Sequence, residues 1–143
     1  MQIREILTLK SDTIYSIAPT DSVSSAVSRM VELGVGSLVV LKNGEMVGLL
    51  TERDVIHGMA EGHDLKNAEV STVMVSEPVV ANAEDSVDYA RDVMTKSHIG
   101  HLPIFDGNKL LGIISFHDVA RACLKEAKFE NSLLKRYIKH WPE

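Results

Sequence analysis

The sequence has little cysteine: Cys123 stands alone, which excludes an internal disulfide and is typical of a reducing compartment. It also lacks any run of the roughly 20 apolar residues that a membrane-spanning helix needs. Near its start, Arg4, Glu5 and Lys10 interrupt the apolar stretch that a signal peptide requires. We therefore expect a soluble, cytoplasmic protein with no membrane partner.

An excess of positive charge is also absent. The 143 residues have a formal net charge of -5, whereas proteins that bind a phosphate backbone usually cluster extra lysine and arginine. We therefore expect no nucleic-acid partner. The length is that of one ordinary domain, and with 45% hydrophobic residues the chain can bury a core.

Motifs of catalysis are missing too. The sequence contains no G-x-S-x-G elbow, no Walker loop and no G-x-G-x-x-G turn. Two pairs of close carboxylates, Glu52 with Asp54 and Glu84 with Asp85, stand at expected helix starts, where acidic residues favour the helix dipole. His98 and His101 form an H-x-x-H without a third ligand nearby. We expect neither an enzyme nor a metal site.

What the sequence does contain is an internal repeat with an offset of 64 residues. GLLTERDV (residues 48–55) aligns without a gap on GIISFHDV (residues 112–119). Identical residues recur at the same offset upstream, in the pairs Asp21 and Asp85, Ser22 and Ser86, Val23 and Val87, Ala26 and Ala90, Met30 and Met94, and Gly36 and Gly100. Such self-similarity indicates two copies of one supersecondary unit.

Each copy is expected to fold as strand, helix, hairpin and helix. In the first copy, residues 14–17 are extended, a helix follows an N-cap at Asp21 or Ser22, and Asn43-Gly44 between two apolar runs predicts a hairpin. The last helix begins after Thr51 and ends near Gly62. The second copy repeats this order, with its hairpin around residues 106–108.

The organisation expected along the chain is repeat 1 at residues 6–62, a linker at 63–76 with a helical turn before Val75, and repeat 2 at 77–125. Pro103 cannot donate a ladder hydrogen bond, so its strand is expected to be an edge strand or to begin there.

The tail, residues 126–143, is expected to be an amphipathic helix. Phe129, Leu133, Tyr137 and Trp141 recur every four residues, with Leu134 and Ile138 beside them. The apolar stripe either packs on the chain's own core, which is the interpretation we favour, or seals a dimer or binds a partner.

The two repeats resemble a tandem pair of CBS domains, the Bateman module. The resemblance rests on G-h-h-[ST]-x-x-D at residues 48–54 and 112–118 and on Gly100-His101-Leu102-Pro103. It implies an α/β fold in which two pseudo-symmetric repeats pack as one module, here with an added C-terminal helix. It further implies clefts between the repeats that bind adenosine compounds, a regulatory role and a homodimer.

Thr51 and Asp54 allow two interpretations. Locally they form a capping box, which occurs at helix starts of every function. The functional interpretation is that the helix N-terminus attracts phosphate and that the Asp carboxylate accepts the two ribose hydroxyls. The resemblance implies the second role for Thr51 and Asp54 in one cleft and for Ser115 and Asp118 in the other.

The resemblance also implies an adenine slot formed by the first strand and the stretch before the hairpin. The matching positions are Tyr15, Val35, Gly36 and Ser37 in one copy and Val79, Ile99, Gly100 and His101 in the other. The two glycines would let a ligand approach the backbone. Tyr15 is equally well explained as a strand residue at the edge of the core.

Candidate phosphate donors are Arg53, His101 and His117, although each is also compatible with a solvated surface residue. Arg53 and His117 occupy the same place in the two copies. The difference between Glu52-Arg53 in one copy and Phe116-His117 in the other predicts that the first cleft favours more phosphate charge and the second less, or differently placed, charge.

We therefore expect a non-catalytic sensor that binds AMP, ADP, ATP, NAD or S-adenosylmethionine and acts on a regulated protein that the sequence does not identify. The alternative is a dimerisation or interaction module whose ligand clefts are vestigial and whose apolar tail makes the contact. An enzyme acting on the nucleotide is the third hypothesis.

Overall fold

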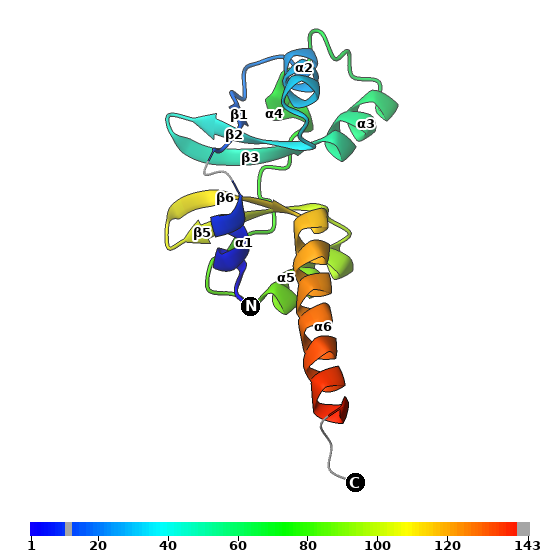
Figure 1. Ribbon diagram of the computed structural model, residues 1–143. Coiled ribbons are helices and arrows are strands. Elements are labelled where there is room, and N and C mark those ends of the chain that lie inside the picture. Colours follow the sequence, from blue (N-terminus) through cyan, green and yellow to red (C-terminus); the bar gives the residue numbers. More distant parts are fainter. Residues whose placement is uncertain (11–12, 140–143) are drawn as a thin grey trace. The chain divides into compact units, whose positions relative to one another are not determined.

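The computed structural model describes residues 1–10 and 13–139, and the chain divides into two compact units (Figure 1). Residues 13–80 form what we call the continuous unit. Residues 1–12 together with 81–143 form the split unit. Each unit contains a three-stranded sheet with helices, which confirms the expected α/β class and its two repeats. Over the described residues, no helix has the length and apolar character of a bilayer span.

The continuous unit follows the expected order of elements. They are β1 (Ser16–Ile17), α2 (Val23–Leu33), β2 (Ser37–Lys42), β3 (Glu45–Thr51), α3 (Glu52–Ala60) and α4 (Val70–Val73). In the sheet, β1 runs parallel to β2, and β2 pairs with β3 as an antiparallel hairpin.

Local sequence signals explain the ends of these elements. The Ser22 side chain accepts a hydrogen bond from the Ser25 backbone N–H at 3.1 Å and begins α2. Gly34, with a φ of 67°, ends α2 in the left-handed conformation. Asn43 and Gly44 have φ values of 53° and 79°, as a type I′ hairpin turn requires.

The core of the continuous unit is built from α2, the hairpin and the segment expected to be a linker. Leu38 and Leu50 are fully buried on the sheet, and Val70 of α4 is buried with them. Leu65 packs against the same cluster. Residues 63–76 therefore contain part of the core, because their apolar side chains cover an open face of this unit.

The split unit contains α1 (Ile3–Leu9), β4 (Ala81–Asn82), α5 (Val87–Ser97), β5 (His101–Asp106), β6 (Lys109–Ser115) and α6 (Phe116–Lys139). Its sheet has the order β4-β5-β6 and repeats the pairing of the other sheet, including a register shift at the equivalent position. The expected tail helix is the continuation of α6, which runs unbroken from the cap of repeat 2.

The strand that holds Pro103 is central and begins at His101, so the expectation that it is an edge strand or begins at Pro103 is wrong. β5 lies between β4 and β6. Proline is tolerated because β4 is short and pairs only with Ile104 and Phe105. At the equivalent position of the continuous unit, the Val39 N–H donates to the Tyr15 carbonyl at 3.0 Å, a bond that proline cannot make.

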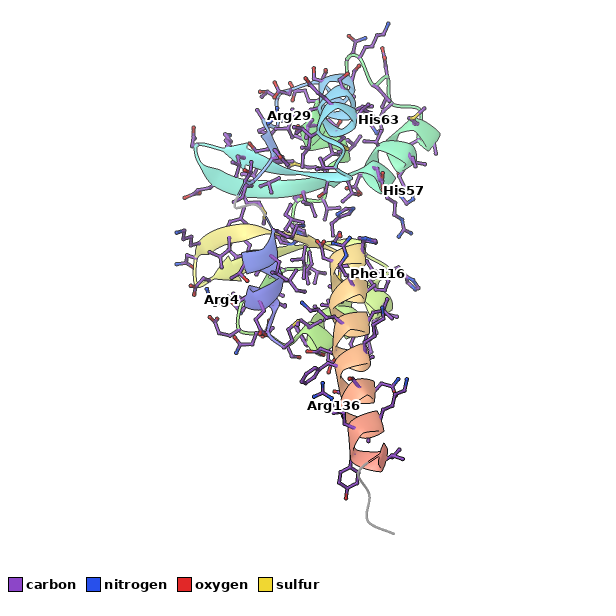
Figure 2. All side chains as sticks on the ribbon, viewed as in Figure 1. Arg4, Arg29, His57, His63, Phe116 and Arg136 are labelled. Atoms are coloured by element: carbon purple, nitrogen blue, oxygen red, sulfur yellow. The ribbon has the colours of Figure 1, made fainter. Side chains whose placement is uncertain are left out.

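Helix α1 completes the split unit from the other end of the sequence. Ile3 and Ile6 are buried in the core formed by residues 81–122. The backbone N–H of Ile3 donates to the Asp85 carbonyl at 2.9 Å. The Arg4 guanidinium binds the carboxylates of Glu84 and Asp106, and Figure 2 shows Arg4 on α1.

Helix α4 plays the same part in the continuous unit, at an offset of 67 rather than 64. The Val70 N–H donates to the Asp21 carbonyl at 2.8 Å, as that of Ile3 does to the Asp85 carbonyl. The residue before each helix forms an isolated bridge, Gln2 with Ser86 and Glu69 with Ser22. Each repeat is thus closed by a helix that precedes it or follows it in the sequence.

The apolar stripe of the tail is exposed. Within α6, Val119 and Ala122 are buried, but Phe129, Leu133, Leu134, Tyr137 and Ile138 are between 48% and 70% exposed. Figure 1 shows that α6 extends well past the other elements of the split unit, and Arg136 marks this part in Figure 2. The interpretation that this stripe packs on the chain's own core is therefore wrong for the described residues. Trp141 lies outside them.

Candidate functional site

The expected helix cap of the continuous unit is present at the junction of β3 and α3. Asp54 Oδ2 accepts hydrogen bonds from the Thr51 backbone N–H and the Thr51 hydroxyl, both at 2.9 Å. Thr51 Oγ1 in turn accepts the Asp54 N–H at 3.3 Å. This is a complete capping box, and it holds a part-buried carboxylate at the N-terminus of a helix.

The split unit repeats the cap between β6 and α6. Asp118 Oδ2 accepts the Ser115 N–H at 2.8 Å, and the Asp118 N–H donates to Ser115 Oγ at 3.1 Å. The Lys10 ammonium also lies 2.6 Å from Asp118 Oδ2. The structure thus confirms both predicted caps and adds a cation to one of them.

Burial is the largest influence on the Asp118 carboxyl and by itself raises its pKa. The hydrogen bond from Lys10, the backbone hydrogen bond from Ser115 and the Lys10 charge together outweigh burial. The pKa of Asp118 is therefore held below its ordinary value, and the group is a carboxylate at neutral pH.

Each cap is tied to the stretch that precedes its hairpin. The Glu52 N–H donates to the Gly36 carbonyl at 3.0 Å, and the Phe116 N–H donates to the Gly100 carbonyl at 2.8 Å. The strand register also places Ser37 opposite Thr51. The same register relation holds between His101 and Ser115. The structure therefore brings the predicted adenine stretches next to the predicted ribose carboxylates.

The remaining predicted adenine residues fill different places. Val35 and Ile99 pack partly against the cores of their units. Tyr15 also packs on the core, as the structural interpretation expected, while Val79 is exposed. No described atom lies within 4 Å of a Cβ built on Gly100, which leaves open space beside that backbone.

The three predicted phosphate donors also lie in different environments. Arg53 lies exposed in the first turn of α3. The His117 ring nitrogen Nε2 is 2.8 Å from Nη2 of Arg121, one helical turn further along α6. His101 begins β5 and is half-buried.

His98 ends α5 in the left-handed conformation, with a φ of 54°. Across residues 1–10 and 13–139, no three His, Cys, Asp or Glu side chains gather as metal ligands do.

Lys10 is the site residue that sequence reasoning missed. It was assigned to neither cleft, because residues 1–10 have no counterpart at the offset of 64. A signal exists at the offset of 67, where Ile3, Ile6 and Leu7 align with Val70, Val73 and Met74. That alignment would have predicted that residues 3–7 form a helix like α4 and pack against the second repeat.

The chemical capacity of the two sites follows from these parts. Each combines a carboxylate, which accepts hydroxyl hydrogen bonds, with the partly positive N-terminus of a helix, which attracts anions. A ligand with a diol and an anionic group would satisfy both.

Comparison with known proteins agrees with this arrangement. The family model for the CBS domain matches residues 3–61 and 70–125. A mitochondrial CBS domain-containing protein of Arabidopsis thaliana, CBSX3, is 34% identical over 124 residues, which are 82% of this chain and 60% of that protein.

Two solved structures share the fold. A CBS-domain protein from Burkholderia ambifaria has a TM-score of 0.84 and 29% identity, covering 87% of this chain and 95% of that one. The CBS domain pair of the protein MJ0100, solved in complex with 5′-methylthioadenosine and S-adenosyl-L-methionine, has a TM-score of 0.77 and 20% identity, covering 88% and 98%. Since the family model matches most of the sequence, in two copies, this chain belongs to the CBS domain family as a pair of CBS repeats.

Proposed function

We propose that the chain is a non-catalytic regulatory module that binds adenosine compounds through the carboxylates of Asp54 and Asp118. The observation that carries the proposal is the duplicated cap. In both repeats a part-buried carboxylate lies at a helix N-terminus. The first backbone N–H of that helix donates a hydrogen bond to the glycine carbonyl before the hairpin. The complex of MJ0100 with two adenosine compounds supports the ligand class.

The role of each group follows from its chemistry. The carboxylate accepts the 2′ and 3′ hydroxyls of a ribose, and the helix N-terminus favours a phosphate. AMP, ADP, ATP, NAD and S-adenosylmethionine all carry the ribose, so the carboxylate by itself does not choose among them. A bound ligand then shifts the shape or association of the chain by its differential affinity for two states.

The test is a thermal-shift panel with these five compounds. Binding to the native state raises the melting temperature by mass action, and Asp54→Ala together with Asp118→Ala should remove the shift. Asp21→Ala with Asp85→Ala is a matched control, because these aspartates recur at the same offset and their carboxylates accept hydrogen bonds from nearby backbone N–H groups, Ala18 and Asn82. The proposal fails if no compound stabilises the wild type, or if both double variants respond alike.

The exposed stripe of α6 favours a second function, the assembly of two copies. Phe129, Leu133 and Tyr137 extend the helix face that carries the buried Val119 and Ala122. A second copy offers an identical stripe, so two α6 helices can cover each other in one symmetric contact. The same helix would then pack on its own core at one end and on its partner at the other.

Sedimentation equilibrium separates this second function from the first. Leu133→Glu and a truncation after Lys125 should both yield monomers, whereas Asp54→Ala with Asp118→Ala should leave a dimer. Lys128→Glu is a control that alters the charge of α6 without removing an apolar side chain. A wild-type monomer at high protein concentration, or a dimer that survives the truncation, would contradict assembly through α6.

A further inference from the structure

The Lys10 ammonium lies where a ligand of the split unit would bind. Its Nζ is 2.6 Å from Asp118 Oδ2 and 3.0 Å from the carbonyl oxygen of Ile113, which lies in β6 two residues before Ser115. The Lys10 side chain is 37% exposed and that of Asp118 is 16% exposed. The pair is therefore partly open to solvent, and a ligand can reach it.

Helix α1 delivers Lys10 to this position. Ile3 and Ile6 anchor the helix in the core, and Leu7 Cδ2 lies 3.2 Å from a Cβ built on Gly112. The Lys10 N–H then donates to the Leu7 carbonyl at 3.2 Å and ends the helix. Because α1 is fixed at two buried residues, Lys10 reaches the Asp118 cap, and within residues 1–10 and 13–139 Asp118 is the acidic group with which it forms an ion pair.

In the continuous unit a backbone N–H takes the place of the lysine at the equivalent carbonyl. The Leu49 carbonyl, equivalent to that of Ile113, accepts the backbone N–H of Val75 at 3.0 Å. Asp54 is bonded by Thr51, and no ion pair to Asp54 occurs among the described residues. At the offset of 67, the position that corresponds to Lys10 is Glu77, which has the opposite charge.

A ribose diol and the ammonium require the same carboxylate. When the hydroxyls of a ribose donate hydrogen bonds to the Asp118 carboxylate, the Lys10 ammonium either keeps a place on the same carboxylate or is displaced from it. Displacement is possible because the ammonium is carried on a flexible four-carbon side chain. A ligand that carries a phosphate gives the ammonium a new anionic partner, whereas an uncharged or cationic adenosine compound does not. A phosphate on the ligand thus offsets part of the free energy lost when the Lys10–Asp118 ion pair breaks, and a ligand without a phosphate does not.

We propose that Lys10 makes the split-unit site selective for phosphorylated adenosine compounds. This inference rests on the proposed function, since it assumes that Asp118 holds a ribose. It differs from the preference that the sequence suggested from Arg53 and His117, because Lys10 brings to the Asp118 cap a positive charge from outside the repeat motif.

The test uses the full-length chain with Asp54→Ala, so that binding reports on the split unit. Titration calorimetry gives the affinities for AMP and for adenosine, and their ratio is the readout. Adding Lys10→Met should lower the ratio of AMP to adenosine affinity about tenfold, the effect of one charge-assisted hydrogen bond. Lys10→Arg should keep most of it. Lys109→Met is the matched control, because it removes an exposed lysine of the same unit at the far end of the hairpin.

Each result decides the matter. A ratio that falls with Lys10→Met but not with Lys109→Met supports the proposal. If both affinities rise by the same factor, Lys10 only blocks the site, and the selectivity is overturned while ribose binding stands. An unchanged ratio overturns it as well. If neither compound binds the Asp54→Ala chain although both bind the wild type, the split unit is no adenosine site, and the proposed function of Asp118 fails too.

Discussion

The two units contain the same cap, but they hold its carboxylate differently. In the continuous unit, Thr51 supplies both hydrogen bonds to Asp54 Oδ2. In the split unit, Ser115 supplies a backbone bond and Lys10 a charge. A duplicated motif therefore preserves the local geometry, while the segment that closes each unit sets the electrostatics.

The largest expected difference concerns the closing helices themselves. Ile3→Ala and Val70→Ala each remove a fully buried side chain, and we expect losses in the free energy of unfolding of about 3 and about 2 kcal/mol. Urea denaturation measures both. The exposed Ile56→Ala is the control, because Ile56 lies on α3 away from the apolar stripe of α6, and it should change stability by less than about 0.5 kcal/mol. If Ile3→Ala is as mild as that control, α1 does not close the split unit.

A second comparison uses the glycines of the two hairpins. A Cβ on Gly48 would lie 2.6 Å from Met74 Sδ and 2.9 Å from the Val75 carbonyl oxygen, which is fixed by its bond to Leu49. A Cβ on Gly112 would meet only Leu7 Cδ2 at 3.2 Å. Gly48→Ala should therefore cost about 2 kcal/mol and Gly112→Ala less than about 1 kcal/mol. Thermal unfolding of both variants checks this order, and equal losses would mean that α1 and α4 approach the hairpins equally closely.

The caps provide a third comparison. Thr51→Ala leaves Asp54 Oδ2 with one of its two bonds, whereas after Ser115→Ala the Lys10 ammonium still holds Asp118. We expect losses of about 1.5 and about 1 kcal/mol, within the usual range for a cap. Urea unfolding of the two variants side by side measures them. A larger loss for Ser115→Ala would show that Lys10 contributes nothing to the cap.

The smallest expected effect is on pH dependence and concerns Asp118 of the split unit. Because the folded-state pKa of Asp118 is below its ordinary value of 3.8, the ionised group stabilises the fold above that value. This contribution is lost as the pH falls through the lowered pKa. The wild type should thus be more stable than Lys10→Met near neutral pH, and the difference should shrink in acid. Urea unfolding at several pH values tests this, and a difference independent of pH would contradict the ion pair.

Sequence reasoning found what is encoded locally. The caps at Thr51 and Ser115 and the turn at Asn43-Gly44 were predicted, since each depends on residues within four positions of one another. The helical turn before Val75 was predicted and is α4, but its place in the core was not. Helix α1 was missed because its alignment with α4 shifts from 64 to 67 residues, and it contacts the repeat most distant from it in sequence. Lys10 and Asp118 are 108 residues apart, and no local pattern predicts such a pair.

The tail shows the same limit in another form. Its amphipathic face was predicted from the spacing of Phe129, Leu133 and Tyr137. Periodicity identifies an apolar face but not the surface that covers it, so the interpretation of an intramolecular contact was wrong for the described residues.

The attachment of α1 to the split unit also sets an order of folding. During synthesis, residues 13–80 emerge as one uninterrupted stretch and can fold as soon as they are complete. Helix α1 is made before this stretch but must wait for β5, β6 and Ala122 before Ile3 and Ile6 have a core to enter. Until then these side chains remain in water, and closing so long a loop slows the final step. The first residues of the chain are thus the last to reach their native place.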